Sequence, residues 1–247
     1  MEQTLALIFG AFFISAFLKG ITGLGFSTIC LALLASVVDL KLAIPMVLIP
    51  SLGSNILVMR QAGHFRATLS EFKWLYIAAL PGLIAGLALL GSLRSASTAA
   101  VLGAVLVVYA VFALANPTFE LRASLKRTLQ IPTGVLTGLI NGATGSQVMP
   151  VLPFLMSVGL PPERFVQAIN ISFTASSLVM MSGLIYLGLL DWTKALTSAG
   201  GLIPVYVGIK LGGRLRRRLP ERGFRIAVLV MLIALGLNLL RAWAVST

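Results

Sequence analysis

Two glycine-rich stretches inside apolar segments contain the residues of this chain best suited to bind a ligand. They are residues 19–25 (KGITGLG) and residues 141–147 (NGATGSQ). Glycine interrupts a helix, and the helix that restarts after the break offers free backbone N–H groups and the positive end of its dipole. Such helix ends bind anions, and transporters place them near the middle of the bilayer. Glycines that serve only close helix packing are the alternative explanation.

Lys19 is the first residue of the first stretch and lies about midway along the apolar segment 4–37. A cation at that depth costs several kcal/mol unless it is paired or hydrated, so Lys19 is a candidate anion contact. Snorkelling to the membrane surface is the alternative, and it is a sufficient explanation for Lys210, which lies about one turn from a basic loop. The equivalent residue in the second stretch is Asn141, so the predicted site has one cationic side and one amide side.

Uncharged polar residues near both breaks add hydroxyl and amide donors that suit an oxyanion. Ser51 and Asn55, for example, share one helix face at i, i+4 spacing. Hydrogen bonding between helices is the alternative role for any of them. The predicted substrate-binding residues are Lys19, Gly20, Thr22, Gly23, Gly25, Ser51, Asn55, Asn141, Gly142, Thr144, Gly145, Ser146, Gln147, Asn170, Ser172 and Ser176.

The sequence lacks the residue sets that catalysis or metal binding would need. Its seven carboxylates all flank apolar segments, its one histidine is His64, and its one cysteine is Cys30. We therefore expect no catalytic residue, no metal site, no cofactor and no buried carboxylate proton relay. The run GITGLG at 20–25 does not match a dinucleotide-binding loop.

The composition indicates an integral membrane protein, because 58% of the residues are hydrophobic, only 11% are charged and the mean hydropathy is +1.00. A spanning helix needs about 20 apolar residues. The net charge of +12 is typical of basic cytoplasmic loops rather than of a nucleic-acid-binding protein. The N-terminus lacks signal-peptide features, so we expect the first segment to stay in the mature protein. Unbroken apolar segments lie at 42–59, 72–91, 98–115, 165–190, 193–213 and 224–243.

A constant offset of 122 residues relates the two halves of the chain. It places Gly20 on Gly142 at one end of the unit, and it also matches glycines and an arginine at the other end. One offset that serves both ends indicates an internal duplication. We therefore expect two membrane repeats, residues 1–121 and residues 122–247.

Two arrangements of these segments compete. If each broken segment crosses once, the repeats are parallel, and the basic loops 60–73 and 213–223 fall on opposite faces, against the positive-inside rule. If each broken segment is a hairpin, the repeats are inverted, with 13 lysines and arginines inside and 4 outside. The charge count favours an all-α polytopic membrane protein with two inverted repeats, each a glycine-broken helical hairpin plus three transmembrane helices. The hairpins are then re-entrant or strongly tilted, because each broken segment is short for two complete spans.

The glycine motif at 20–25, its counterpart at Gly142–Gly145, the prolines Pro45 and Pro150, and the basic central loop together resemble the TauE/SafE family. The members of this family are sulfite exporter-like membrane permeases. The resemblance extends over essentially the whole chain. It implies an exporter or permease of sulfite, sulfoacetate or a related organosulfur anion.

We therefore expect a secondary transporter, and specifically an exporter, that moves a small anion by alternating access around the two helix breaks. The expected partners are that anion and the lipid of the inner (plasma) membrane, which the chain crosses several times. A homodimer is one candidate assembly, and no nucleic acid is expected. Export of one negative charge from a negative interior yields about 2.3 kcal/mol per 100 mV, so uncoupled export is feasible, as is coupling through a proton on the substrate. A non-transporting membrane scaffold or assembly subunit is the alternative class, and a membrane-embedded enzyme is disfavoured.

Overall fold

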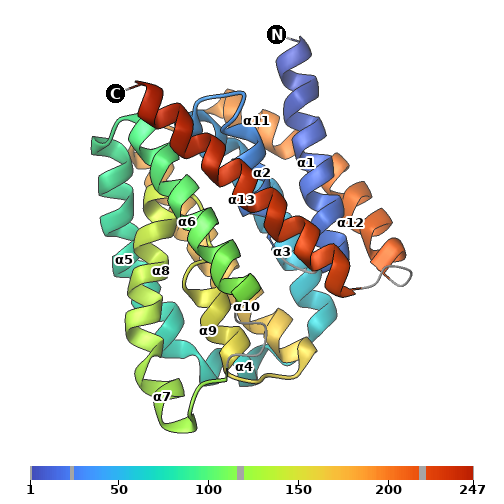
Figure 1. Cartoon of the computed structure of the whole chain (residues 1–247), viewed down its shortest axis with the longest axis vertical. Helices are drawn as coiled ribbons and strands as arrows, with labels where there is room; N and C mark the ends of the chain where they lie inside the picture. The colour runs from blue at the N-terminus through green and yellow to red at the C-terminus, as the bar shows by residue number, and fades with distance from the viewer. Residues whose placement is uncertain (1, 23–24, 116–119, 217–220, 247) are drawn as a thin grey trace.

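The computed structural model describes residues 2–22, 25–115, 120–216 and 221–246, and within them the chain forms only helices and loops. Figure 1 shows the helices assembled into one elongated bundle. The helices are α1 (Glu2–Thr22), α2 (Phe26–Leu34), α3 (Leu40–Ala62), α4 (Phe65–Glu71), α5 (Lys73–Ser92), α6 (Ser95–Ala115), α7 (Ala123–Thr128), α8 (Gln130–Thr144), α9 (Val151–Ser157), α10 (Pro162–Tyr186), α11 (Trp192–Gly200), α12 (Leu202–Arg216) and α13 (Glu221–Ser246).

Seven stretches among the described residues are long and apolar enough to cross a membrane. Six of them correspond to the unbroken apolar segments of the sequence, and α11 and α12 together form one of these, Trp192–Leu215. The seventh is Leu5–Thr22, the first arm of the first broken segment. The chain is therefore a multi-pass membrane protein, as its composition predicts.

Each glycine-rich stretch ends one helix and precedes another. α1 ends at Thr22, and Gly25 stands before α2 with φ of 86°. α8 ends at Thr144, and Gly145 follows it with φ of 73°. Both φ values lie in the left-handed region, which glycine adopts without the penalty that a Cβ would bring. Helix breaks thus occur where the glycine pattern predicts them.

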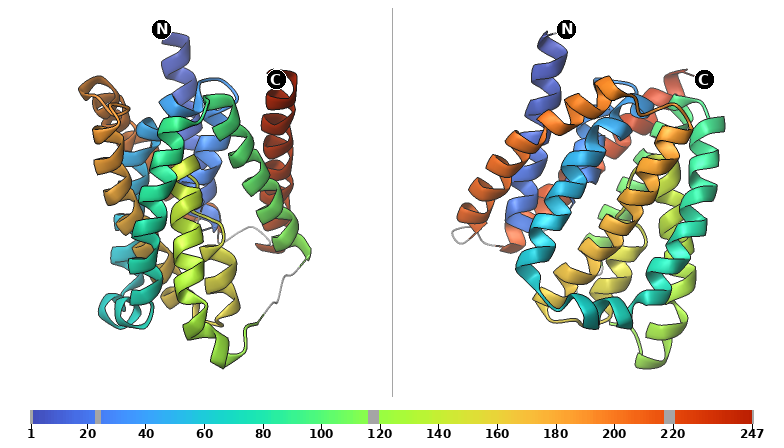
Figure 2. Two further views of the ribbon diagram at one scale, coloured as in Figure 1. Left: turned by 90° about the vertical axis from the view of Figure 1, so that its left-hand side faces the viewer. Right: turned by 180° about the vertical axis from the view of Figure 1, so that it is seen from behind.

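Both broken segments turn back toward the end of the molecule from which they start (Figure 1). The loop after α2 lies at the end that also carries the start of α1 and the close of α13, which we call the terminal end. The loop after α9 lies at the opposite end, near α4 and α7. Figure 2 shows the same arrangement from the side and from behind. Each broken segment is therefore a helical hairpin, and the two hairpins start from opposite ends of the bundle.

Several helices of the two halves correspond at the 122-residue offset, in one bound, in packing partners or in a local hydrogen bond. α3 and α10 begin at Leu40 and Pro162, and α1 and α8 end at Thr22 and Thr144. α1 packs on α12 as α8 packs on α5, while α3 packs on α10 and α6 on α13. The hydroxyl groups of Thr22 and Thr144 each donate to the carbonyl four residues earlier, at 2.9 and 2.7 Å.

Glycines bring the backbones of paired helices into direct contact. A Cβ on Gly138 of α8 would overlap the carbonyl oxygen of Ala79 on α5. A Cβ on Gly20 of α1 would lie 2.5 Å from the carbonyl oxygen of Ile209 on α12. Gly142 meets α5 in the same way. Close helix packing, the alternative explanation offered for the glycine motifs, thus accounts for Gly20 and Gly142.

A proline inside α3 is compensated by a hydroxyl group from another helix. Pro50 has no N–H to donate to the carbonyl of Met46. Ser198 of α11 donates its hydroxyl to that carbonyl at 2.7 Å and accepts from the N–H of Ile49 at 3.3 Å. Hydroxyl side chains commonly satisfy backbone groups freed by proline in membrane helices, and here the contact also fixes α11 against α3.

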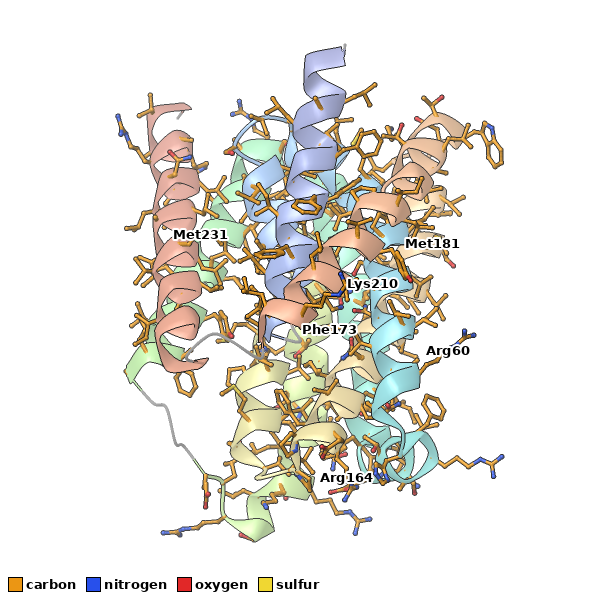
Figure 3. The ribbon with its side chains drawn as sticks, turned by 90° about the vertical axis from the view of Figure 1, so that its right-hand side faces the viewer. Arg60, Arg164, Phe173, Met181, Lys210 and Met231 are labelled. Carbon is orange, nitrogen blue, oxygen red and sulfur yellow. The ribbon has the colours of Figure 1, made fainter. Side chains whose placement is uncertain are left out.

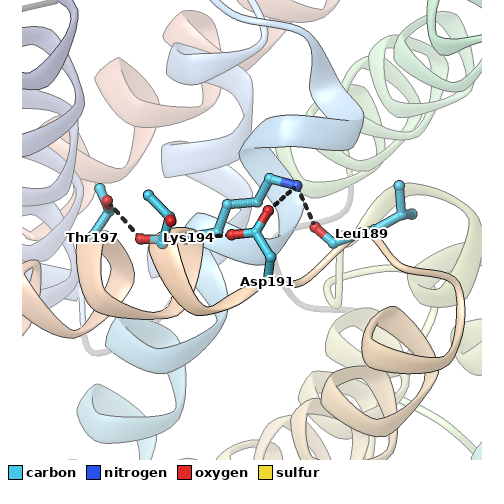
Figure 4. A network of polar contacts seen from close by, with 5 residues as sticks. Leu189, Asp191, Lys194 and Thr197 are labelled. Carbon is cyan, nitrogen blue, oxygen red and sulfur yellow. Dashed lines mark hydrogen bonds and ion pairs between the residues drawn. The ribbon is translucent and has the colours of Figure 1, made fainter.

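Asp191 caps the first turn of α11 (Figure 4). Its carboxylate accepts a hydrogen bond of 2.8 Å from the backbone N–H of Lys194 and lies 3.0 Å from the Lys194 ammonium group. The ammonium group also donates to the carbonyl of Leu189 at 3.0 Å. These contacts, the backbone hydrogen bond first, lower the pKa of Asp191 below its ordinary value. The cap holds the turn between α10 and α11 at the terminal end.

The close contact between α5 and α8 predicts that replacing a glycine in it by alanine lowers the stability of the protein. Gly138→Ala places a methyl group into the backbone of α5, so we expect a loss of about 1–3 kcal/mol of stability. The thermal midpoint can be followed with a thiol-reactive dye, because the one cysteine, Cys30, is fully buried and becomes reactive on unfolding. Gly10→Ala is the matched control, since no atom lies within 4 Å of a Cβ there. Equal midpoints for the two variants would contradict the packing argument.

Candidate functional site

Lys19 is buried in the middle of the bundle and holds only neutral partners. Its side chain is 2% exposed, and its ammonium group donates to Ser54 Oγ at 3.0 Å and to Asn55 Oδ1 at 2.6 Å, both on α3. Among the described residues the salt bridges are Arg164–Glu71 and Lys194–Asp191, so no described carboxylate pairs with Lys19. Burial of a cation without an anion is costly, and a bound anion would offset that cost.

Buried hydroxyl and amide groups continue from Lys19 across the boundary between the two halves. On α3, Ser51 Oγ lies 2.7 Å from Ser27 Oγ of α2. Thr28 Oγ1 of α2 lies 3.4 Å from Ser146 Oγ in the second break. The helix that follows the first break is therefore in contact with the second break, more than a hundred residues away in sequence.

The second break contributes amide groups, some of which have no partner. Gln147 Nε2 donates to Ser177 Oγ of α10 at 3.1 Å, while Gln147 Oε1 has no partner. Both amide atoms of Asn141 are buried and unpaired, and so is Nδ2 of Asn55. Buried polar atoms almost always find partners, so unpaired ones next to a cavity point to a ligand or to water.

A small cavity of about 10 Å³ lies among these groups. Its polar lining comes from both breaks and from the two long helices that separate them: Ser27, Ser51, Asn141, Gln147 and Ser177. A space of this size holds about one water molecule. The centre of the bundle is thus polar but closed to anything larger in this conformation.

A larger cavity, of about 810 Å³, reaches Lys19 from one side. It is bounded by the last residues of α3 and α12 and by the first residues of α10, including Ala62, Arg214 and Glu163. We call this the basic-end cavity, because it lies toward the end of the bundle that carries Arg164 (Figure 3). Lys19 is one of its lining residues, although it is only 2% exposed.

The remaining predicted site residues fall into two groups. Thr22, Gly25, Thr144, Gly145 and Ser146 lie at the breaks themselves, and Gly145 also lines the small cavity. On α10, Asn170 donates to the carbonyl of Val166 at 2.7 Å and leaves its own oxygen unpaired, whereas Ser172 and Ser176 are buried but line neither cavity. Gly20 lines the basic-end cavity while it packs against α12, and Gly142 packs against α5. Gly23 lies outside the described residues.

Several residues around the site are absent from the prediction made from the sequence. Ser54 accepts a hydrogen bond from Lys19, and Ser177 lines the small cavity. Each stands beside a predicted residue, and helical spacing alone did not distinguish the neighbours. Lys210 and Tyr206 were missed because snorkelling explained the lysine, yet both line the basic-end cavity. The i, i+4 spacing of these two residues on one helix face was a signal that could have identified them.

Among the described residues, no group of three or more histidine, cysteine, aspartate or glutamate side chains could hold a metal ion. The arrangement instead combines one buried cation, neutral hydrogen-bond donors and an access cavity. Such a set can bind and release a small anion without breaking a covalent bond.

Comparison with known protein families matches residues 7–239 to the family described as Sulfite exporter TauE/SafE. The match extends over nearly the whole chain. No curated protein and no solved structure matches the sequence.

Proposed function

The chain belongs to the Sulfite exporter TauE/SafE family, and from this premise we propose that it exports a small anion such as sulfite, sulfoacetate or a related organosulfonate. The proposed process is secondary transport by alternating access around the two helix breaks. The observation that carries the proposal is the buried Lys19, which has neutral partners and borders an open cavity. An anion that enters the cavity finds there a positive charge that the described residues do not neutralise.

The proposed binding site uses groups from both hairpins. Lys19 supplies the charge, and the hydroxyl and amide groups of Ser51, Asn55, Asn141 and Gln147 supply hydrogen-bond donors to oxyanion oxygens. The small central cavity has room for about one water molecule. The two hairpins must therefore separate before the anion can reach the amide groups of Asn141 and Gln147. The fully loaded site then has one cationic side and one amide side.

We also propose that residues 1–121 and 122–247 are inverted repeats. Support comes from the matching helix bounds, the matching helix pairs and the two hairpins that start from opposite ends of the bundle (Figure 1). In this arrangement the basic end is cytoplasmic and the terminal end is external, in agreement with the positive-inside rule. The basic-end cavity then opens to the cytoplasm, where the substrate of an exporter is found.

The membrane potential supplies a driving force for export. Movement of one negative charge out of a negative interior releases about 2.3 kcal/mol per 100 mV, so no buried carboxylate relay is required. A non-transporting scaffold, the alternative class, is expected to have its polar faces packed shut. A cavity of about 810 Å³ whose wall includes a buried lysine favours transport instead.

Replacement of Lys19 tests the proposed site. A charged hydrogen bond is worth about 1.5–3 kcal/mol, so Lys19→Ala should lower anion transport roughly tenfold or more. The measurement is initial efflux from proteoliposomes loaded in turn with sulfite, sulfoacetate, sulfate or taurine. Arg241→Ala, which removes an exposed cation from α13, is the matched control and should transport at the wild-type rate. Wild-type efflux by a folded Lys19→Ala protein would exclude Lys19 from the site.

Tags at three positions test the proposed inversion. We expect the N-terminus and the C-terminus to be accessible from outside the cell and the loop 116–128 to be accessible only from the cytoplasm. Impermeant labelling of intact cells and of inverted vesicles distinguishes the two faces. A cytoplasmic N-terminus would contradict the inverted arrangement, whatever the result of the transport assay.

A further inference from the structure

The wall of the basic-end cavity carries a second pair of cations. Lys210 and Arg214 are exposed on α12, and both line the cavity whose wall includes Lys19. They stand at i, i+4 and so project from one face of the helix. Tyr206, one turn earlier on that face, places its ring 5.6 Å from the Lys210 ammonium group. Glu163 is the carboxylate among the lining residues, against three cations.

Close packing of α1 on α12 brings the two lysines to the same space. A Cβ on Gly20 would lie 2.5 Å from the carbonyl oxygen of Ile209, so these two backbones touch. Lys19 precedes Gly20 and Lys210 follows Ile209, and both side chains border the cavity. The register of this helix pair thus places a buried cation and an exposed one on the wall of one cavity.

Lys210 lies within a candidate membrane span and lines the basic-end cavity. Figure 3 shows it near the mid-height of the bundle, closer to the middle than Arg60 and Arg164. Cations that line a cavity within a membrane span commonly mark ion pathways.

We propose that Lys210, Arg214 and Tyr206 form a separate anion-binding station, at which the substrate is held before it passes to Lys19. The proposal rests on the proposed transport function and adds a second site to it. Cations that line a cleft with low-dielectric walls concentrate anions and accelerate their capture by about 10- to 1,000-fold. The aromatic ring holds the ammonium group over the cavity wall. The station binds small oxyanions of the kind that Lys19 accepts.

Restoration of the charge by chemical modification tests the station. Lys210→Cys is made in a Cys30→Ala background, so that residue 210 is the one thiol. Efflux of sulfoacetate, which does not cleave mixed disulfides as sulfite does, should fall roughly tenfold at low concentration. Aminoethyl methanethiosulfonate, which adds an ammonium group, should restore efflux, whereas neutral methyl methanethiosulfonate should not. Arg94→Ala, which removes an exposed cation from outside the cavity, should leave efflux unchanged.

The possible failures are distinguishable. If the wild-type protein moves no anion of the panel, the proposed function fails. If it does and Lys210→Cys transports at the same rate, or if the added ammonium group restores nothing, the station is wrong. A thermal midpoint from an intrinsic tryptophan melt confirms that each variant is folded.

An independent observation concerns the register of the two equivalent helix pairs. On α5, Gly86 faces the carbonyl of Leu139 on α8. The equivalent residue on α12, Gly208, faces the carbonyl of Phe13 on α1, which is four residues earlier than the offset of 122 requires. Gly212, one turn later, takes the expected place against Phe17. The two pairs therefore differ by one helical turn.

Small residues at four-residue spacing allow both registers. α8 carries glycine at 134, 138 and 142, and α12 carries it at 208 and 212. One-turn steps of about 5.4 Å between packed elements are a known form of conformational switching. We infer that alternating access is a slide by one helical turn. In this slide the α1–α12 pair adopts the present register of the α5–α8 pair, and the α5–α8 pair adopts the present register of the α1–α12 pair. In the other register, residue 212 takes the place that Leu90, a fully buried leucine, occupies on α5.

A single methyl group at a suitable glycine should therefore hold the protein in the other register. Gly212→Ala overlaps Phe17 in the present register but is accommodated after the slide, and Gly82→Ala does the same on the α5 side by overlapping Val135. Gly213→Ala is the matched control, because its nearest contact is 3.9 Å away. The readout is labelling of Val58→Cys, in the cavity wall, by an impermeant maleimide in a Cys30→Ala background.

We expect labelling to fall severalfold in Gly212→Ala and in Gly82→Ala and to stay unchanged in Gly213→Ala. Unchanged labelling in all three variants overturns the slide. Loss of folding in both Gly212→Ala and Gly82→Ala overturns it as well, because the second register should accommodate the added methyl group.

Discussion

A lysine ammonium group inside a helical bundle loses most of its hydration, and hydroxyl and amide groups return only part of that energy. Lys19 is in this position, held by Ser54 and Asn55 and without a described carboxylate beside it. The surrounding structure is organised around this unneutralised charge. α3 presents Ser54 and Asn55 to it, hydroxyl contacts continue from α3 to α2 and to the second break, and the basic-end cavity borders it. If Lys19 served only the packing of the bundle, an apolar residue at this position would make the protein more stable.

The glycines have a second role besides interrupting helices. In membranes, helices associate through close packing rather than through the hydrophobic effect, so residues without bulky side chains form the interfaces. Gly138 and Gly142 allow α8 to lie directly on α5, and Gly20 allows α1 to lie directly on α12. These contacts set the depth of Lys19 and of Lys210. The packing explanation and the binding explanation of the motifs are therefore complementary, because close packing positions the charges.

The sequence predicted the membrane spans and the helix breaks, because apolar length and glycine content each reflect a local constraint. It did not predict which face of each helix lines a cavity. Ser177 reaches the small cavity while Ser176 does not, a distinction that depends on the rotation of α10. The contribution of Lys210 to the cavity wall was not predicted for a similar reason, since distance along the chain from a basic loop does not report which face of α12 meets the cavity. The compensation of Pro50 by Ser198 depends on a contact between helices that no local pattern encodes.

Lys19 and Asn141 occupy equivalent positions in the two halves but differ in charge. For halves that arose by duplication, this difference has an evolutionary consequence. Two separate copies of one half, assembled as an antiparallel dimer, would carry either two lysines at the centre or none. Two lysines would repel each other, and two asparagines would give no charge. Fusion into one chain allows a lysine in one half and an asparagine at the equivalent position of the other. The joining of the halves therefore permits one positive charge at this pair of positions, a value that a symmetric ancestor could not reach.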